Sequence, residues 1–120
     1  MDSNNYTSEI KKQFEGKVII ITGSTQGSGA ETAKLFAARG AKAITICGRQ
    51  ENKGLQIKKE IEELGAKCLY VKADLSKVED CKKIVALTDT EFGTVHSLVN
   101  VAGYTERGTI LSATLENYEN

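Results

Sequence analysis

Short aliphatic runs alternate with longer segments of helical periodicity along most of the chain. A polar segment up to Glu15 gives way at Gly16 to a run rich in β-branched residues, which is typical of a buried strand. Three later segments carry small or apolar residues at helical spacing and end at glycines. The last of these begins with a capping-box pattern, Ser76 followed by Glu79. We expect strands at 17–22, 43–47, 68–71 and 96–101, and helices at 27–39, 51–64 and 77–92.

The phrase Gly-Ala-Lys occurs twice, at 40–42 and at 65–67, each time just before an expected strand. The offset of 25 residues is about one β-α unit. Strands that alternate with helices predict a parallel sheet, and near-continuous apolar strands predict that both of its faces are covered. We therefore predict an α/β fold with a doubly wound parallel sheet of about four strands. A ligand is expected where the chain reverses past the first strand, which sends the third helix to the opposite face from the first two.

Composition and charge restrict the class of protein. The 120 residues hold one domain or part of one, and we expect a polar tail at 1–14 followed by a single domain at 15–120. Sixteen basic and sixteen acidic residues cancel, which argues against nucleic acid or an anionic membrane surface as a partner. Any anion must therefore be bound locally. No apolar run is long enough to span a bilayer and the start lacks the pattern of a signal peptide, so we expect a cytoplasmic protein.

The three cysteines do not suggest a metal site. Cys47, Cys68 and Cys81 are widely spaced and are accompanied by one histidine, His96, which provides no plausible zinc ligand set. Reduced thiols in the core of a cytosolic protein are the favoured interpretation.

The first expected strand leads directly into a glycine-rich loop that opens a helix. The loop reads Thr-Gly-Ser-Thr-Gln-Gly-Ser-Gly over 22–29. Glycines permit a tight turn and close approach of a ligand to the backbone, while the N–H groups and dipole of a helix start attract a pyrophosphate. A flexible turn without a ligand is the alternative interpretation of the loop. An NTPase is disfavoured, because the Gly-Lys-Ser/Thr that ends a P-loop is missing here. The strand before and the helix after favour a phosphate loop, whose candidate residues are Gly23, Ser24, Thr25, Gly27, Ser28 and Gly29.

The residues after the second expected strand bear on which dinucleotide binds. About 20 residues past such a loop, a dinucleotide-binding fold presents an acid to the ribose hydroxyls or a basic group to a 2′-phosphate. Gly48 and Arg49 stand there, and an arginine binds phosphate through two parallel hydrogen bonds. We therefore expect NADP, with NAD as the second choice. Glu51 weakens this preference if it faces the ribose, and a solvated turn residue is the alternative interpretation of Arg49.

Taken together, these motifs resemble those of the short-chain dehydrogenase/reductase family. The 22–29 loop is similar to the family's nucleotide loop, Asp74 and Leu75 are similar to the segment whose acid meets the adenine amino group, and 100–103 is similar to its Asn-Asn-Ala-Gly stretch. The resemblance implies a three-layer Rossmann-type fold and hydride transfer between NADP(H) and an alcohol or carbonyl substrate, often in a homo-oligomer. It adds five coenzyme-binding candidates, Asp74, Leu75, Asn100, Ala102 and Gly103.

Several positions depart from the family pattern. Ser28 stands where the family usually carries an apolar residue, Val101 replaces the second asparagine, and Gln26 is neutral where many NADP-preferring members are basic. His96 takes the place of a common aspartate. For His96, a partly buried side chain with a backbone partner is favoured over a catalytic role.

The chain lacks the family's catalytic pair, a Tyr-x-x-x-Lys on one helix face whose lysine lowers the tyrosine pKa for proton transfer. No tyrosine here is followed by lysine at that spacing, so we assign no catalytic residue. Two hypotheses remain open. The first is the coenzyme-binding portion of an oxidoreductase whose catalytic half lies beyond Asn120. The second is a naturally short, non-catalytic chain that binds a dinucleotide or regulates a partner subunit.

Overall fold

The computed structural model describes residues 13–23 and 27–100 and confirms each predicted strand and helix, with ends that differ by at most one residue. Small and branched apolar residues form the strands, and amphipathic segments form the helices. In chain order the elements are β1 (Val18–Thr22), α2 (Gly27–Ala38), β2 (Ala43–Gly48), α3 (Glu51–Glu63), β3 (Lys67–Lys72), α4 (Val78–Phe92) and β4 (Ser97–Asn100).

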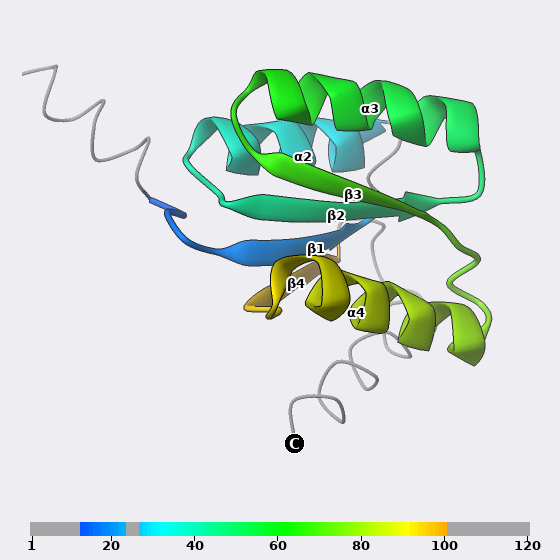
Figure 1. Cartoon of the computed structure of the whole chain (residues 1–120). Coiled ribbons are helices and arrows are strands. Elements are labelled where there is room, and N and C mark those ends of the chain that lie inside the picture. The colour runs from blue at the N-terminus through cyan, green and yellow to red at the C-terminus, as the bar shows by residue number, and fades with distance from the viewer. Residues whose placement is uncertain (1–12, 24–26, 101–120) are drawn as a thin grey trace, which may run out of the picture.

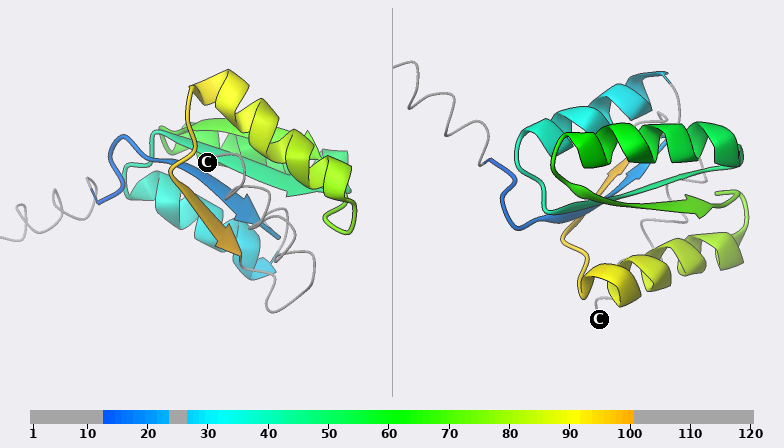
Figure 2. Two further views of the ribbon diagram at one scale, coloured as in Figure 1. Left: turned by 90° about the horizontal axis from the view of Figure 1, so that it is seen from below. Right: turned by 45° about the horizontal axis from the view of Figure 1, so that its top comes forward.

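The four strands form one parallel sheet in the order β3-β2-β1-β4. The chain moves outward from β1 to β3 and then crosses back to place β4 on the other side of β1. Helices α2 and α3 cover one face of the sheet and α4 covers the other (Figures 1 and 2). The predicted three-layer α/β fold of Rossmann type is therefore confirmed, together with the reversal past the first strand.

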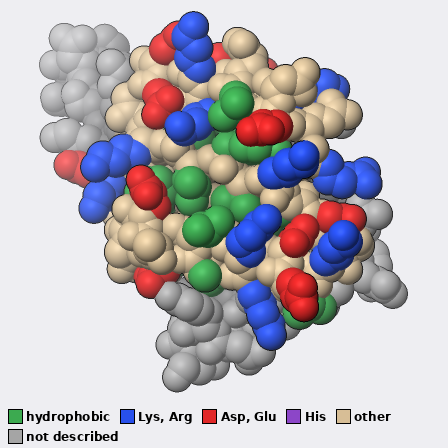
Figure 3. All heavy atoms as spheres, turned by 45° about the vertical axis from the view of Figure 1, so that its right-hand side comes forward, with side chains coloured by type: hydrophobic (Ala, Val, Ile, Leu, Met, Phe, Trp, Pro, Cys, Tyr) green, Lys and Arg blue, Asp and Glu red, His purple; other side chains and the backbone are tan. Residues whose placement is uncertain are grey.

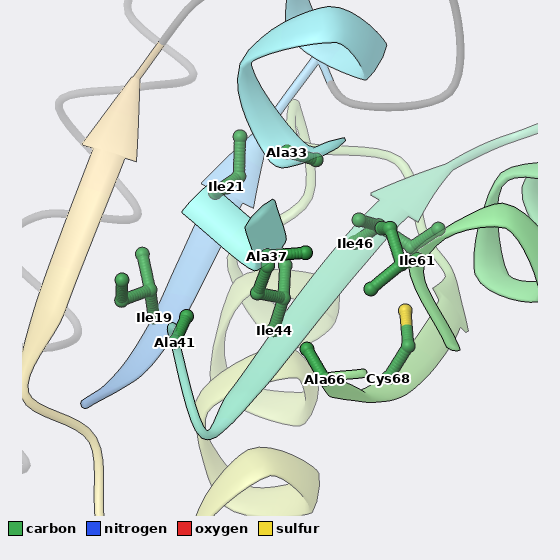
Figure 4. Packing of buried hydrophobic residues seen from close by; sticks show 10 residues of the cluster. All are labelled: Ile19, Ile21, Ala33, Ala37, Ala41, Ile44, Ile46, Ile61, Ala66 and Cys68. Atoms are coloured by element: carbon green, nitrogen blue, oxygen red, sulfur yellow. The ribbon is translucent and has the colours of Figure 1, made fainter. Parts of the chain in front are cut away.

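The sheet buries apolar side chains on both of its faces because successive residues of a strand point in opposite directions. Ile19 and Ile21 of β1 belong to the cluster beneath α2 and α3, whereas Ile20 belongs to the cluster beneath α4. In the first cluster, Ala33 and Ala37 of α2 lie over the isoleucines of β1 and β2 (Figure 4). Such small side chains let the helix pack close to the sheet. Each fully buried isoleucine contributes about 1.5 to 3 kcal/mol to the free energy of unfolding.

Helix α4 is tied to the sheet by a buried pair of threonines. The Thr88 hydroxyl donates to the carbonyl oxygen of Ile84 at 2.7 Å, and it lies 2.8 Å from the Thr45 hydroxyl on β2. A hydroxyl has one proton, so Thr45 is the donor in the bond between the two side chains. Both residues are fully buried, and this arrangement gives each hydroxyl group a partner.

The start of α4 differs from the sequence prediction. The helix begins at Val78 with Lys77 as its N-cap and has no side-chain cap bond, so the capping box of Ser76 and Glu79 is wrong. Ser76 instead donates both its backbone N–H, at 2.9 Å, and its hydroxyl, at 2.7 Å, to Oδ1 of Asp74. In a capping box the backbone N–H of Ser76 would donate to Glu79. Asp74 accepts it instead, because Asp side chains readily accept from the backbone two residues on.

The residues before β1 pack against the end of α2. The backbone N–H of Phe14 donates to the carbonyl oxygen of Arg39, and the Phe14 and Phe36 rings lie 4.5 Å apart at a tilt of 44°.

In the described part of the chain, no helix combines the length and apolar character needed to cross a membrane.

His96, just before β4, supports the first residue of β1. Its Nδ1 accepts the backbone N–H of Val18 at 2.9 Å, while its own backbone N–H donates to the carbonyl oxygen of Val18. The predicted backbone partner of His96 is thus confirmed, although the residue is exposed rather than partly buried. Because Nδ1 is the acceptor, the proton of the neutral ring lies on Nε2.

Replacing His96 with alanine should lower the free energy of unfolding by about 1 kcal/mol, since the Val18 N–H loses its acceptor. His96→Asn is the matched control, because its Oδ1 occupies nearly the same position as the histidine Nδ1. Urea denaturation of both variants measures the difference. Equal stability of the alanine and asparagine variants would contradict a role for this hydrogen bond.

Candidate functional site

The carboxyl ends of all four strands meet at one edge of the sheet, since the strands are parallel. At this edge the chain leaves β1 toward α2 on one face. The neighbouring β4 is reached from α4 on the other face, through a connection at the opposite edge of the sheet. Open α/β sheets bind ligands at such a reversal point, outside the carboxyl ends of the strands. The candidate site therefore lies where β1 and β4 end side by side.

A hydrogen bond joins the ends of these two strands. Thr22, the last residue of β1, is in register with Asn100, the last residue of β4. The buried Thr22 hydroxyl lies 2.9 Å from Oδ1 of Asn100 and 3.4 Å from the carbonyl oxygen of Val99. Asn100, one of the predicted coenzyme-binding residues, thus has a partner on β1. Thr22 was absent from the predicted site residues, although a polar residue that ends an otherwise aliphatic strand is a recognisable signal.

The glycine loop follows directly from Thr22. Gly23 is exposed and has φ of 64°, a left-handed conformation that favours glycine. Gly27 begins α2, whose first turn carries no acidic residue, and Gly29 is buried within the helix. An anion near the start of α2 therefore meets no opposing carboxylate from that turn. Ser24 and Thr25 lie outside the described residues, and the side chain of Ser28 is not described.

Arg49 follows the last residue of β2 at the same edge and is exposed. Within residues 13–23 and 27–100, its guanidinium group takes part in no ion pair. The preceding Gly48 uses its carbonyl oxygen to accept two hydrogen bonds, from the backbone N–H of Ala73 at 3.1 Å and from the hydroxyl of Tyr70 at 2.7 Å. Glu51 is the first residue of α3, and its charge adds to burial in raising the pKa of Tyr70.

Asp74 and Leu75 lie just beyond the end of β3. Oδ1 of Asp74 holds the two Ser76 donors, and the backbone N–H of Asp74 donates to Oδ2 of Asp80 at 2.7 Å. Asp74 is therefore a turn residue whose carboxylate is oriented by its hydrogen bonds to Ser76. Leu75 packs partly against the cluster beneath α4. Ala102 and Gly103 lie outside the described residues.

Charge is evenly distributed over the face shown in Figure 3, where acidic and basic side chains are interspersed among a few hydrophobic ones. A broad attractive field for an anion is thus absent from this face, and attraction must come from local groups such as the α2 start and Arg49. Among the described residues, no group of three or more His, Cys, Asp or Glu side chains is arranged to hold a metal ion.

Residues 17–120 match the family model for short chain dehydrogenases. The chain belongs to the short-chain dehydrogenase family.

Similar short-chain dehydrogenase sequences and structures occur in plants and bacteria. An 11-beta-hydroxysteroid dehydrogenase of Arabidopsis thaliana is 36% identical over 102 residues, which are 84% of this chain and 29% of that protein. The solved structure of a citronellol catabolism dehydrogenase from Pseudomonas aeruginosa is 29% identical with a TM-score of 0.79, over 89% of this chain and 52% of that one. A short-chain dehydrogenase/reductase of Burkholderia phymatum, solved in complex with NAD, is 28% identical with a TM-score of 0.67, over 71% of this chain and 30% of that one. The chain thus spans about half the length of these relatives or less.

The cysteines of this short-chain dehydrogenase lie in its core. Cys47, Cys68 and Cys81 are all free and buried, as predicted for core thiols. Burial raises the pKa of Cys47 to about 12 and that of Cys68 to about 12, and it also raises the pKa of Cys81. The thiolate is the reactive form of cysteine, and a raised pKa favours the less reactive protonated thiol.

Replacing Thr22 with valine should lower the free energy of unfolding by about 1 kcal/mol, because Oδ1 of Asn100 loses a donor while side-chain volume is nearly preserved. Thr22→Ser retains the hydroxyl but loses a buried methyl group, so it measures the packing contribution apart from the hydrogen bond. Urea denaturation of the three proteins, followed by circular dichroism, provides the comparison. A Thr22→Val protein as stable as the wild type would show that the bond between β1 and β4 contributes nothing measurable.

Proposed function

We propose that this chain forms the coenzyme-binding part of an oxidoreductase that transfers hydride between NADP(H) and an alcohol or carbonyl substrate. The observation that carries the proposal is the junction at the carboxyl end of β1. There a buried strand ends beside β4, turns through Gly23 with positive φ and continues into the start of α2. Membership of the short-chain dehydrogenase family supports the same function.

The residues at this edge fit a dinucleotide chemically. Backbone N–H groups at the start of α2 suit the pyrophosphate, since no acidic side chain occupies the first turn. The Asp74 carboxylate, oriented by its turn, suits an amino group such as that of adenine. When bound, the nicotinamide ring supplies the hydride or accepts it. The described residues bind and orient the coenzyme, and the proposal assigns none of them to proton transfer.

Arg49 supports NADP as the preferred coenzyme. Its exposed guanidinium group lies at the end of β2, where the ribose of a dinucleotide is expected, and it is unpaired within the described residues. The negative charge of Glu51, which follows closely at the start of α3, opposes this preference. NAD therefore remains the second choice, and the Burkholderia relative was solved with NAD.

For a catalytic protein, we also propose the source of its missing residues, its oligomeric state and its location. The Tyr-x-x-x-Lys pair of the family mechanism does not occur in these 120 residues. A catalytic protein would therefore supply it from further residues, and we expect such a protein to form a homo-oligomer in the cytoplasm.

An antibody against residues 1–15 allows the native protein to be captured and its intact mass measured. A mass well above 13.0 kDa supports the oxidoreductase, whereas 13.0 kDa favours the short, non-catalytic dinucleotide-binding chain.

Gly23→Val should weaken the binding of NADP and of NAD by about a hundredfold, or about 3 kcal/mol, since its side chain enters the pyrophosphate site. The variant also strains a positive φ. Gly93→Val is the matched control, because Gly93 has φ of 81° at the end of α4 and open space around its missing Cβ. The control should lose stability and keep its affinity in calorimetric titrations. Wild-type affinity in folded Gly23→Val protein would refute the loop assignment.

Arg49→Asp should shift the preference from NADP toward NAD by about 10- to 100-fold, which corresponds to the loss of a charged hydrogen bond to the 2′-phosphate. Arg39→Asp makes the same change of charge directly after the last residue of α2, at the end of that helix away from the glycine loop. It should leave the ratio of the two affinities unaltered. Titration of each protein with both coenzymes provides the ratio. An unchanged ratio in Arg49→Asp would show that Arg49 does not contact the 2′-phosphate.

A further inference from the structure

Tyr70 contacts the chain on both sides of the turn that carries Arg49. Before the turn, its hydroxyl donates to the carbonyl oxygen of Gly48, the last residue of β2, at 2.7 Å. After the turn, its ring lies against Gly54 in the first turn of α3. Tyr70 itself is on β3, so three elements meet at this one side chain.

Gly54 marks how closely the ring fits. A Cβ placed on this buried glycine would overlap the Tyr70 ring at Cδ1, Cε1 and Cζ. Glycine in a helix costs about 1 kcal/mol relative to alanine, so its presence inside α3 needs a reason. The reason in this fold is the space that the tyrosine ring occupies.

At the helical end of the turn, the backbone N–H of Gly54 donates to the carbonyl oxygen of Gln50 at 3.0 Å. Gln50, the N-cap of α3, makes no side-chain cap hydrogen bond. Arg49 lies between Gly48 and the helix start. The Gly48 carbonyl oxygen accepts from the Tyr70 hydroxyl and from the backbone N–H of Ala73, and Tyr70 contacts the helix start with its ring. Burial, followed by the charge of Glu51, raises the pKa of Tyr70, so the hydroxyl keeps the proton that it donates.

We infer that Tyr70 is a positioning residue that fixes the turn between β2 and α3 and thereby determines how strongly Arg49 favours a coenzyme with a 2′-phosphate. The inference rests on the proposed function. Tyr70 itself touches neither the phosphate nor the reacting atoms. Its hydroxyl acts on the carbonyl that precedes Arg49, so its loss should affect NADP far more than NAD.

Tyr70→Phe tests the inference, because it removes the hydroxyl and keeps the ring against Gly54. In calorimetric titrations of the full chain, affinity for NADP should fall by about fivefold and affinity for NAD by less than about twofold. Thr45→Val is the matched control, since it removes another hydrogen-bonded hydroxyl, from β2 on the side that faces α4. It should lower stability without altering the ratio of the two affinities.

A second pair of variants tests whether Tyr70 acts through Arg49. In an Arg49→Gln background, Tyr70→Phe should leave the ratio of affinities as it was, since the side chain that it positions is already missing.

Gly54→Ala keeps the hydroxyl but displaces the ring, and it should lower the preference for NADP in the same direction as Tyr70→Phe.

The outcomes separate the inference from the proposed function. Equal losses for both coenzymes, or an unchanged ratio in Tyr70→Phe, would overturn the positioning role while coenzyme binding stands. A wild-type chain that binds both coenzymes without preferring NADP would overturn the assignment of Arg49 and the inference with it. A folded wild-type chain that binds neither coenzyme would overturn the proposed function itself.

Discussion

Strand β1 has no exposed face, and this constraint governs the rest of the fold. Its five residues are all buried, and it pairs in parallel with β2 on one side and β4 on the other. A parallel strand in that position requires helices above and below it, which α2 and α3 provide on one face and α4 on the other. The same strand ends at Thr22 and is followed by Gly23. The element that organises the core therefore also places the glycine loop at the sheet edge.

The layers and the element boundaries could be predicted because their signals are local. Continuous aliphatic residues at 18–21 indicate a strand buried on both faces, and glycines at 40, 65 and 93 end three segments of helical character. The position of Arg49 at the end of β2 follows from the same periodicity. Alternation of strands and helices then leaves few topologies, of which the reversal past β1 is the one observed.

The contacts that tie the site together could not be predicted in this way. Thr22 and Asn100 are 78 positions apart, and Tyr70 reaches a carbonyl 22 positions earlier in the chain. Such pairs depend on strand register and on the depth at which a helix packs, neither of which a local pattern contains. Ser76 shows the opposite failure: its local pattern predicts a capping box, but Asp74 accepts the backbone N–H that the capping box would direct to Glu79. Gly54 did carry a signal, as an unexplained glycine within an amphipathic helix.

The burial of the three cysteines gives the protein an internal reporter of its own opening. Cys68 belongs to the cluster beneath α2 and α3, while Cys47 and Cys81 belong to the cluster beneath α4. A thiol reagent reaches each of them when the surrounding layer separates from the sheet, so the labelling rate at each cysteine measures the free energy of that local separation. The two faces of the sheet can thus be followed independently in a single experiment, without introducing any foreign probe.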